Sequence, residues 1–359
     1  MTNKPLFFHF KENLSNERLL SQSTNPLELI KEINLQNNTQ TNPKILILTN
    51  KSDIESDLIG LNLLKNGIEY SKIIEEDIPL NFKCKFHIYK KQKFYIQSGD
   101  QLINLKKIKL VLFRYFDLRF LCYLSGVYQI FYSQQWYQTF LNLKNCLKST
   151  WINDPEKTMQ SENRLSQLII AKKIGFKIPK TLITNDPKEA KNFFIKNSKS
   201  VIMKVLHHHR IDIGYNTFNF FAKEVDKEVL DKIDDLILSP IIFQTKIKKQ
   251  VEIRVTIIGE RIFACGLEAD SEIFSDIHKI KEKEMKFNEI ELDDEISKKC
   301  LRLMNKLGLK ISSIDLIIDK ETREVYFLEI NPIGDWLWIE NKTKMPITNT
   351  VCDLLQSYN

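Results

Sequence analysis

Three oxygen-bearing side chains near the C-terminus have the types and spacing of a site for a hard metal ion. Asp315 ends one apolar run, and Glu329 and Asn331 lie together at the end of the next. Residues 320–323 between the runs have the composition of a hairpin turn, which would bring Asp315 level with the other two, because residues two apart on a strand share a face. Two carboxylates and an amide oxygen favour Mg²⁺ carrying nucleotide phosphates over zinc or iron.

The alternative is that these three residues are ordinary polar side chains at strand ends. An acid flanked by Phe327, Leu328 and Ile330 is costly to bury without a charged partner, and a metal ion would supply one. The same segment continues into Trp336 and Trp338, which could form a substrate platform or simply pack in the interior.

Two basic residues inside apolar strands could meet phosphate. Lys204 lies in the sequence VIMKVL, where a buried ammonium group needs an anionic partner, unless its side chain reaches solvent at the strand end. Arg254 lies two residues after Glu252, so both point to one face of the sheet. Its guanidinium can clamp phosphate or carboxylate with two hydrogen bonds, or form a plain cross-strand ion pair. The residues that end the preceding apolar strand could offer backbone groups to a flat heterocycle such as adenine; they are Gln244, Thr245, Lys246 and Ile247.

The sequence lacks the local signatures of several other chemistries. His207, His208 and His209 are adjacent, so on a strand they would point in alternate directions; with Arg210 they predict a basic loop over phosphates rather than a metal cluster. No nucleophile–base pattern, no GxxxxGK[ST] loop and no GxGxxG motif occurs. The six cysteines include no CxxC pair, which argues against structural zinc and a disulfide framework and favours a reducing cytoplasm.

Length and charge set broad limits. With 359 residues the chain has room for two or three domains, and 43% hydrophobic and 28% charged residues are typical of a globular protein in water. The net charge of +7 comes from scattered lysines, so it does not choose among nucleotide, acidic peptide and nucleic acid. The N-terminus lacks an apolar run of signal-peptide length, and residues 111–132 are interrupted by Arg114, Asp117 and Arg119, so we expect no membrane span.

Apolar periodicity predicts three segments that must position these side chains. Residues 1–43 are polar and predict an extension, partly helical around residues 25–33. Residues 44–150 predict a small α/β domain. Its expected elements are strands at 44–49, 69–74 and 110–113, a hairpin within 85–96, and helices at 53–66 and 127–147.

Residues 151–359 predict a second, α+β domain after the interruption at 151–155. Its expected strands lie at 181–184, 200–205, 216–222, 241–247, 252–258 and 261–268. Its expected helices lie at 161–174, after the helix start at 185–187, and at 295–307. The first of these helices places Leu165, Leu168, Ile169 and Ala171 on one apolar side, with Gly175 as terminator.

Taken together, these residues resemble the ATP-grasp superfamily. Lys204, residues 244–247, residues 252–254, Asp315 and residues 329–332 occur in that family's order and approximate spacing. More narrowly, the chain resembles the peptide maturases that make graspetides, the microviridin-type ligases. The stretches that carry this likeness are WINDP at 151–155, residues 161–187 and residues 327–340. The region before Trp151, with Arg114 and Arg119, resembles their pre-grasp domain, so the likeness covers about residues 44–356.

The resemblance implies an α+β ATP-grasp fold preceded by the pre-grasp domain, in a cytoplasmic homodimer without nucleic-acid or membrane partners. ATP would lie between two subdomains of residues 151–359, with Mg²⁺ held by Asp315, Glu329 and Asn331. The resemblance gives Lys204 and Arg254 the role of stabilising the transferring phosphoryl group. The remaining implied nucleotide contacts are Arg164, Gln244, Thr245, Lys246, Ile247 and Glu252.

The implied reaction modifies a ribosomally made precursor peptide with a leader and an acidic core. A side-chain carboxylate would attack the γ-phosphate to give an acyl phosphate, and a hydroxyl or amine of the same peptide would displace phosphate to form an ester or amide. The alternatives are a ligase for amino acids or protein tails, and a silent ATP- or peptide-binding module. Arg164 stands where the family has a lysine, and Asp276-Ile277-His278 stands where microviridin ligases carry Asp-Trp-Arg.

Overall fold

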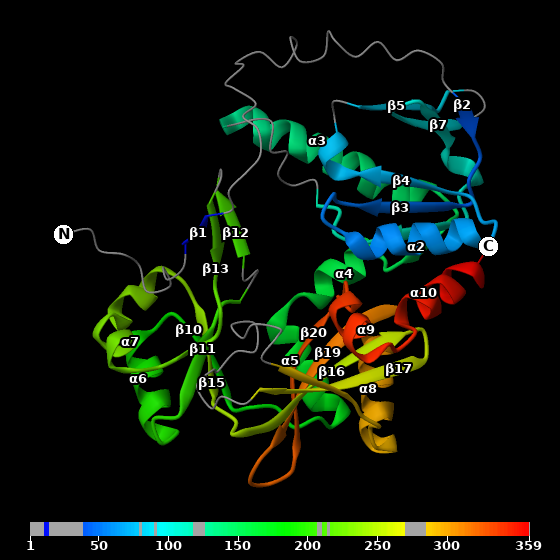
Figure 1. The fold of residues 1–359 in the computed structure, drawn as a ribbon. Helices are drawn as coiled ribbons and strands as arrows, with labels where there is room; N and C mark the ends of the chain where they lie inside the picture. Colours follow the sequence, from blue (N-terminus) through cyan, green and yellow to red (C-terminus); the bar gives the residue numbers. More distant parts are fainter. Residues whose placement is uncertain are drawn as a thin grey trace.

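The computed structural model describes residues 11–13, 39–78, 81–89, 92–117, 126–206, 210–213, 216–269 and 285–358. The expectations for a helix around residues 25–33, for Arg119, for the three histidines at 207–209 and for residues 276–278 lie outside this part. Figure 1 shows a lobe containing β10, β11 and β15 standing beside a larger body that contains β3, β4, α2 and the C-terminal helix α10.

The first sheet is parallel and has apolar cores on both faces. Its strands, in spatial order, are β4 (Tyr70–Ile74), β3 (Ile45–Thr49), β8 (Leu110–Phe113) and β9 (Thr150–Ile152). Ile45 and Ile47 pack with α2 (Ile54–Lys65), whereas Leu46 and Leu48 pack in the core that includes α3 (Gly126–Cys146). Burial on both faces explains the continuous apolar runs in the sequence. The last strand of this sheet, β9, ends at Ile152, two residues beyond the predicted end of the first domain. The division of the chain into domains near residue 150 remains a prediction.

A second small sheet packs against the α3 side of the first. Its strands, in spatial order, are β2 (Thr39–Thr41), β7 (Gln101–Asn104), β6 (Lys93–Ser98) and β5 (Phe82–His87). The hairpin expected within 85–96 is β5–β6, longer at both ends. Phe82 and Ile96 join Val111 and Phe140 in one core, so this sheet and α3 together cover the first sheet.

A lobe with its own core follows in the chain. Its antiparallel strands, in spatial order, are β10 (Thr181–Thr184), β15 (Ile241–Thr245), β11 (Val201–Lys204) and β14 (Lys223–Glu224). Helix α6 (Pro187–Lys196) is capped by Asp186 and packs with α7 (Lys227–Asp231) and η3 (Ile233–Leu238) over this sheet. A hairpin of β12 (Arg210–Ile213) and β13 (Asn216–Asn219) belongs to a different sheet. The strand expected at 216–222 is β13 and ends at Asn219.

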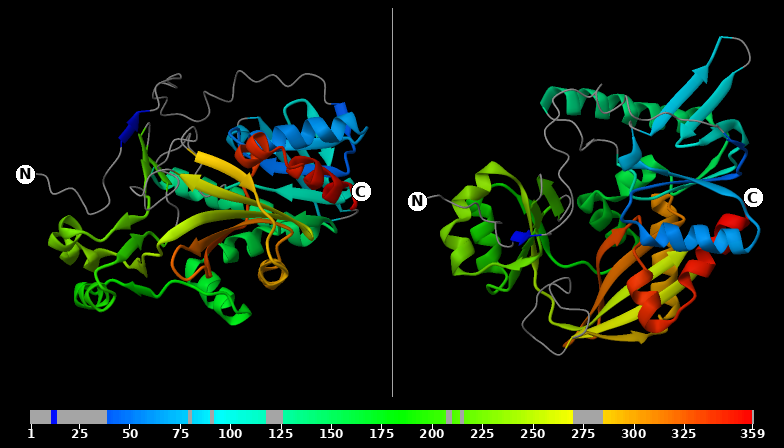
Figure 2. Two further views of the ribbon diagram at one scale, coloured as in Figure 1. Left: turned by 60° about the horizontal axis from the view of Figure 1, so that its bottom comes forward. Right: turned by 45° about the horizontal axis from the view of Figure 1, so that its top comes forward.

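The third major sheet is antiparallel and carries most of the predicted site. Its strands, in spatial order, are β18 (Met285–Glu289), β17 (Arg261–Ala269), β16 (Lys249–Ile258), β19 (Ile311–Asp319) and β20 (Val325–Asn331). One face of this sheet packs on α8 (Asp294–Leu307) and on α5 (Arg164–Ile174). Val255 and Ile314 of the sheet and Leu303 of α8 belong to the shared core. Figure 2 shows these strands running beside that helix layer.

The helix expected at 161–174 is wrong in its start. Two helices occur here, α4 (Pro155–Ser161) and α5 (Arg164–Ile174), because Asp154 and Asn163 each cap a new start. Leu165 and Ile169, on the apolar side of the expected helix, are 50% and 46% exposed. Periodicity marks an apolar stripe, and the packing partner decides which part of it is covered. Leu168 and Ala171 are buried, and Gly175 ends α5 with a φ of 103°, as predicted.

One apolar core joins the first sheet to the third. Helices α9 (Leu337–Thr343) and α10 (Ile347–Gln356) place Trp336 and Val351 in the same core as Ile59 of α2. Trp336 is fully buried and its indole N–H donates to the Thr348 hydroxyl at 3.0 Å. The platform alternative is therefore wrong for Trp336, and the packing alternative is confirmed. No helix in the described residues is long and apolar enough to cross a membrane.

The two sheets formed by β2 to β9, with α2 and α3, make up what we call the first unit. A buried carboxyl group in this unit makes the stability of the protein depend on pH. Burial raises the pKa of Glu75 to about 8, outweighing the backbone N–H of Asp117 that donates to it, and Glu76 adds repulsion. Between its ordinary value of 4.5 and about 8 the folded protein holds a proton that the unfolded chain releases, so stability falls as pH rises through this window. Glu75→Gln should remove this loss of stability. The fall in Tm between pH 5.5 and pH 8.5 will be smaller in this variant than in the unchanged protein. Exposed Glu69→Gln is the control, and an equal drop in both variants contradicts the assignment.

Candidate active site

A charged row crosses the third sheet on the face opposite α5 and α8. Arg254 of β16 lies opposite Asp315 of β19, which lies opposite Glu329 of β20. The predicted hairpin thus forms, with Asp315 level with Glu329. Asn331 lies opposite Ser313, one step further along the same face.

Arginines pair with both carboxylates of this row. One terminal nitrogen of Arg254, Nη1, lies 2.9 Å from each oxygen of Asp315, and Arg164, the first residue of α5, pairs with Glu329. Arg254 is 6% exposed; burial works to lower its pKa, but the Asp315 carboxylate outweighs this and raises the pKa. The cross-strand ion pair is therefore present, and its partner is Asp315 rather than Glu252, which pairs with Lys249 at 3.2 Å.

The donor atoms of this row fit a metal ion that arrives on phosphate. Within the described residues no group of three or more His, Cys, Asp or Glu side chains is placed to hold a metal ion, so the protein side of this row offers two carboxylates and an amide. Mg²⁺ is commonly held by one or two carboxylates while substrate phosphates and water complete its shell. The Nε of Arg254 is buried without a partner, which leaves one donor for a further anion. The Asn331 amide oxygen accepts N–H bonds from Ile333 at 3.1 Å and Gly334 at 3.3 Å, so it also shapes the turn after β20.

Lys204 lies on the sheet of the lobe, at the last position of β11 and opposite Ile242 of β15. It is half-buried, and no described side chain pairs with its ammonium group. The chain passes from this sheet to the charged row through Lys246, Ile247 and Lys248. An unpaired cation at a strand end fits a waiting phosphate, while its partial exposure keeps the solvent-reaching alternative open.

Two residues of the predicted heterocycle segment, Thr245 and Lys246, use their backbone N–H groups within the lobe. Gln244 lies in the central strand β15 and is 3% exposed, with its side-chain amide donating to Thr181 at 3.0 Å. The N–H of Thr245 donates to the Lys180 carbonyl and that of Lys246 to the Ser200 carbonyl, both at 3.0 Å. Among the described residues, no backbone hydrogen bond outside the strands uses the Lys246 carbonyl or the Ile247 N–H.

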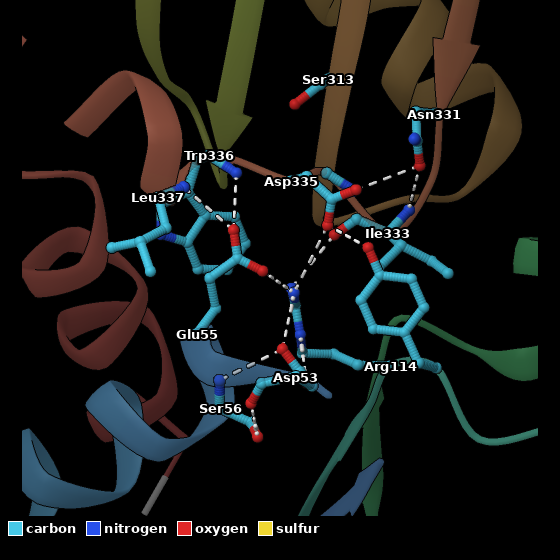
Figure 3. A network of polar contacts seen from close by, with 12 residues as sticks. Asp53, Glu55, Ser56, Arg114, Ser313, Asn331, Ile333, Asp335, Trp336 and Leu337 are labelled. Atoms are coloured by element: carbon cyan, nitrogen blue, oxygen red, sulfur yellow. Dashed lines mark hydrogen bonds and ion pairs between the residues drawn. The ribbon is translucent and has the colours of Figure 1, made fainter. Parts of the chain in front are cut away.

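Figure 3 shows a buried polar network centred on Arg114, at the end of β8. Its Nε donates to Asp53 at 2.9 Å, its Nη2 to Glu55 at 2.5 Å, and its Nη1 to the Ile333 carbonyl at 3.2 Å. The second oxygen of Glu55 accepts the backbone N–H of Trp336 at 2.8 Å. The first unit is therefore hydrogen-bonded to the turn that follows Asn331. The sequence pointed to Arg114 as a charge that interrupts an apolar stretch and as part of a family likeness, but not as a contact to this turn.

Electrostatics in this network follow from burial and charge together. Burial works to raise the pKa of Asp53, but Arg114 holds it below its usual range. Burial keeps the pKa of Glu55 above its usual value despite Arg114, and Asp335 adds repulsion. Tyr115 donates a hydrogen bond to Asp335, so two consecutive residues of the first unit contact the same turn.

Comparison with solved structures decides the family. The structure matches the RiPP-associated ATP-grasp ligase of Chryseobacterium gregarium, solved with ADP and a leader and core peptide, with a TM-score of 0.77 and 26% identity over 88% of this chain and 97% of that one. It matches the macrocyclase MdnC of Microcystis aeruginosa MRC, bound to the precursor peptide MdnA, with a TM-score of 0.78 and 25% identity over 88% and 100%. The chain is an ATP-grasp ligase of the graspetide-maturase type. No protein-family model and no curated protein sequence matches it.

Two buried amides of the ligase hold the strands that carry its acidic residues. Asn153, in the WINDP stretch, accepts the N–H of Lys310 at 2.7 Å and donates to the carbonyls of Ile311 and Pro332. Gln167 of α5 donates to the Ile330 carbonyl at 2.8 Å and accepts its N–H at 3.1 Å. Both act across more than 150 residues of sequence, so only the family likeness of these stretches pointed to them.

Proposed function

We propose that the ligase uses ATP and Mg²⁺ to join a side-chain carboxylate of a ribosomally made peptide to a hydroxyl or amine of the same peptide. The observation that carries this proposal is the row Arg164, Glu329, Asp315 and Arg254, which combines two carboxylates with two fixed guanidinium groups. The peptide class is supported by two solved ligases of the same fold, one with a leader and core peptide and one with a precursor.

The chemistry needs no nucleophile from the protein. A peptide carboxylate attacks the γ-phosphorus, the bond to the β-phosphate oxygen breaks, and ADP leaves. A peptide hydroxyl or amine then attacks the acyl carbon, loses its proton, and inorganic phosphate departs. Bound Mg²⁺ supplies charge neutralisation at the phosphates, with Asp315, Glu329 and Asn331 as its protein ligands.

The chain's own residues orient the phosphates. Asp315 fixes the guanidinium of Arg254, so its remaining N–H groups meet the transferring phosphoryl group without reorganising. Lys204 approaches from the lobe, and Arg164 takes the place of the family's lysine beside Glu329. The Lys246 carbonyl and the Ile247 N–H contact the adenine edge, while Gln244 and Thr245 support that linker and Glu252 borders it.

Lys204→Met tests the phosphate contact. Loss of one charged hydrogen bond should weaken binding of AMPPNP, which keeps the γ-phosphate, about ten- to hundredfold, measured by calorimetry with Mg²⁺ present. Lys196→Met, an exposed lysine on α6, is the matched control and should bind AMPPNP as the unchanged ligase does. Equal affinity in all three proteins would place Lys204 outside the nucleotide site.

A nucleotide-binding module without turnover is the second candidate, favoured by Arg164, which already occupies Glu329. ADP release separates the candidates. Release that depends on an acidic peptide containing Ser, Thr or Lys supports the proposal. Release driven by free amino acids alone points to an amino-acid ligase, and bound nucleotide with no ADP under either condition supports the silent module. The homodimer also remains a proposal, which sedimentation of the purified ligase tests.

A further inference from the structure

The edge of strand β13 carries a strand from the chain's own N-terminus. Strand β1 (Lys11–Asn13) pairs antiparallel with β13, with Lys11 opposite Phe218 and Asn13 opposite Asn216. On its other side β13 pairs with β12, so these three strands form a sheet separate from that of the lobe, as Figure 1 shows. This is the geometry by which extended peptides bind an exposed sheet edge, with main-chain hydrogen bonds supplying the affinity.

The hairpin that receives β1 follows the strand of Lys204 directly. Lys204 ends β11, and the next described strand, β12, begins at Arg210. Strands β12 and β13 have four residues each, and a two-stranded hairpin of this size is marginally stable in water. A third strand adds main-chain hydrogen bonds, so it favours the ordered form of the hairpin that follows Lys204 in the chain.

The sequence around β1 suits a segment that docks. Residues 5–10 read PLFFHF, an apolar run inside an otherwise polar stretch, and exposing such a run to water is unfavourable. Residues 14–38 connect β1 to β2, and a chain of that length reaches several tens of ångströms. A connection of this length allows β1 to dock on β13 of the same molecule. Because the two are parts of one chain, β1 is present at β13 at a high effective concentration.

We propose that residues 1–13 are a cis-acting peptide arm that binds the edge of β13 by strand addition, orders the β12–β13 hairpin, and thereby strengthens nucleotide binding at Lys204. The occupant of the edge is the chain's own N-terminus, because that segment pairs there. Only the effect on nucleotide binding rests on the proposed function; the docking of the arm does not.

Paired substitutions in β1 test the docking. Successive N–H groups of an antiparallel strand point to opposite sides, so one of Lys11 and Glu12 faces β13. Proline at both positions, K11P with E12P, removes that donor, whereas K11A with E12A keeps the main chain intact. Hydrogen exchange at residues 216–219 should be about tenfold faster in the proline variant and unchanged in the alanine variant. Equal exchange in all three proteins overturns the proposal.

The same proteins test the coupling to nucleotide. The proline variant should bind ADP with Mg²⁺ about tenfold more weakly, and a synthetic peptide of residues 1–14 should restore affinity, whereas that peptide with both prolines should not. If residues 216–219 lose protection from exchange in the proline variant while its affinity for ADP is unchanged, docking of the arm is not coupled to nucleotide binding.

If protection of residues 216–219 rises with protein concentration, the arm docks on a second copy of the chain, which overturns docking in cis. If no variant binds nucleotide, the proposed function fails, while hydrogen exchange still decides whether the arm docks.

Discussion

Glu329→Gln will form ADP about a hundred- to thousandfold more slowly than the unchanged ligase in the presence of ATP, Mg²⁺ and peptide. Glu329 lies level with Asp315 on the charged row, and the amide that replaces it keeps the shape but loses the charge that Mg²⁺ requires. The substitution also frees Arg164 from its ion pair. Raising the Mg²⁺ concentration should recover part of the rate, because a weakened metal site fills at higher concentration.

Glu324→Gln is the matched control for this prediction. Glu324 lies just before the same strand and pairs with Lys177, and the two side chains are 37% and 53% exposed. An exposed pair of this kind contributes little to stability, so ADP formation should stay within about twofold of the unchanged rate. A Glu329→Gln protein that keeps its full rate at low Mg²⁺ would remove Glu329 from the metal site.

Arg114→Leu will lower the free energy of unfolding by about 3–5 kcal/mol, which corresponds to a fall in Tm of roughly 10 °C. The substitution leaves Asp53 and Glu55 buried without their cation and removes the bond to the Ile333 carbonyl. Arg114→Lys should recover little, because an ammonium group cannot serve three acceptors with the spacing of a guanidinium. Thermal unfolding followed by circular dichroism measures both variants.

Arg261→Leu provides the comparison for the buried network. Arg261 approaches Asp353 at 3.8 Å, and both side chains are more than half exposed, so this change should shift Tm by no more than about 2 °C. If Arg114→Leu melts within that same range, the network does not hold the first unit against the turn after Asn331.

Local pattern explains which parts of the site the sequence could predict. The Asp315–Glu329 pairing follows from a short turn and alternating strands, both readable within about twenty residues. The pairing of Arg254 with Asp315 joins strands 61 residues apart, and its register is set by packing of the whole sheet. Arg114 finds Asp53 across the same separation. No periodicity in the sequence encodes contacts of that kind.

Burial was the least predictable property. Trp336 and Trp338 have similar surroundings in the sequence, yet Trp336 fills the joint core while Trp338 packs only partly against it. Leu165 and Ile169 fit an apolar helix face that the described part of the chain leaves about half exposed. The ATP-grasp fold itself was predictable, because its motifs are spread in a fixed order from Lys204 to Asn331 and do not depend on any one contact.

The most direct test of the account is the intact mass of an acidic precursor peptide, encoded beside this gene, after incubation with the ligase, ATP and Mg²⁺. We expect the peptide to lose the mass of one water for each bond formed, with one ADP released per water lost, and this mass loss to be about a hundred- to thousandfold slower when Glu329→Gln replaces the unchanged protein. ADP released with the peptide mass unchanged, or a mass loss that does not require ATP, would contradict a carboxylate-activating peptide ligase.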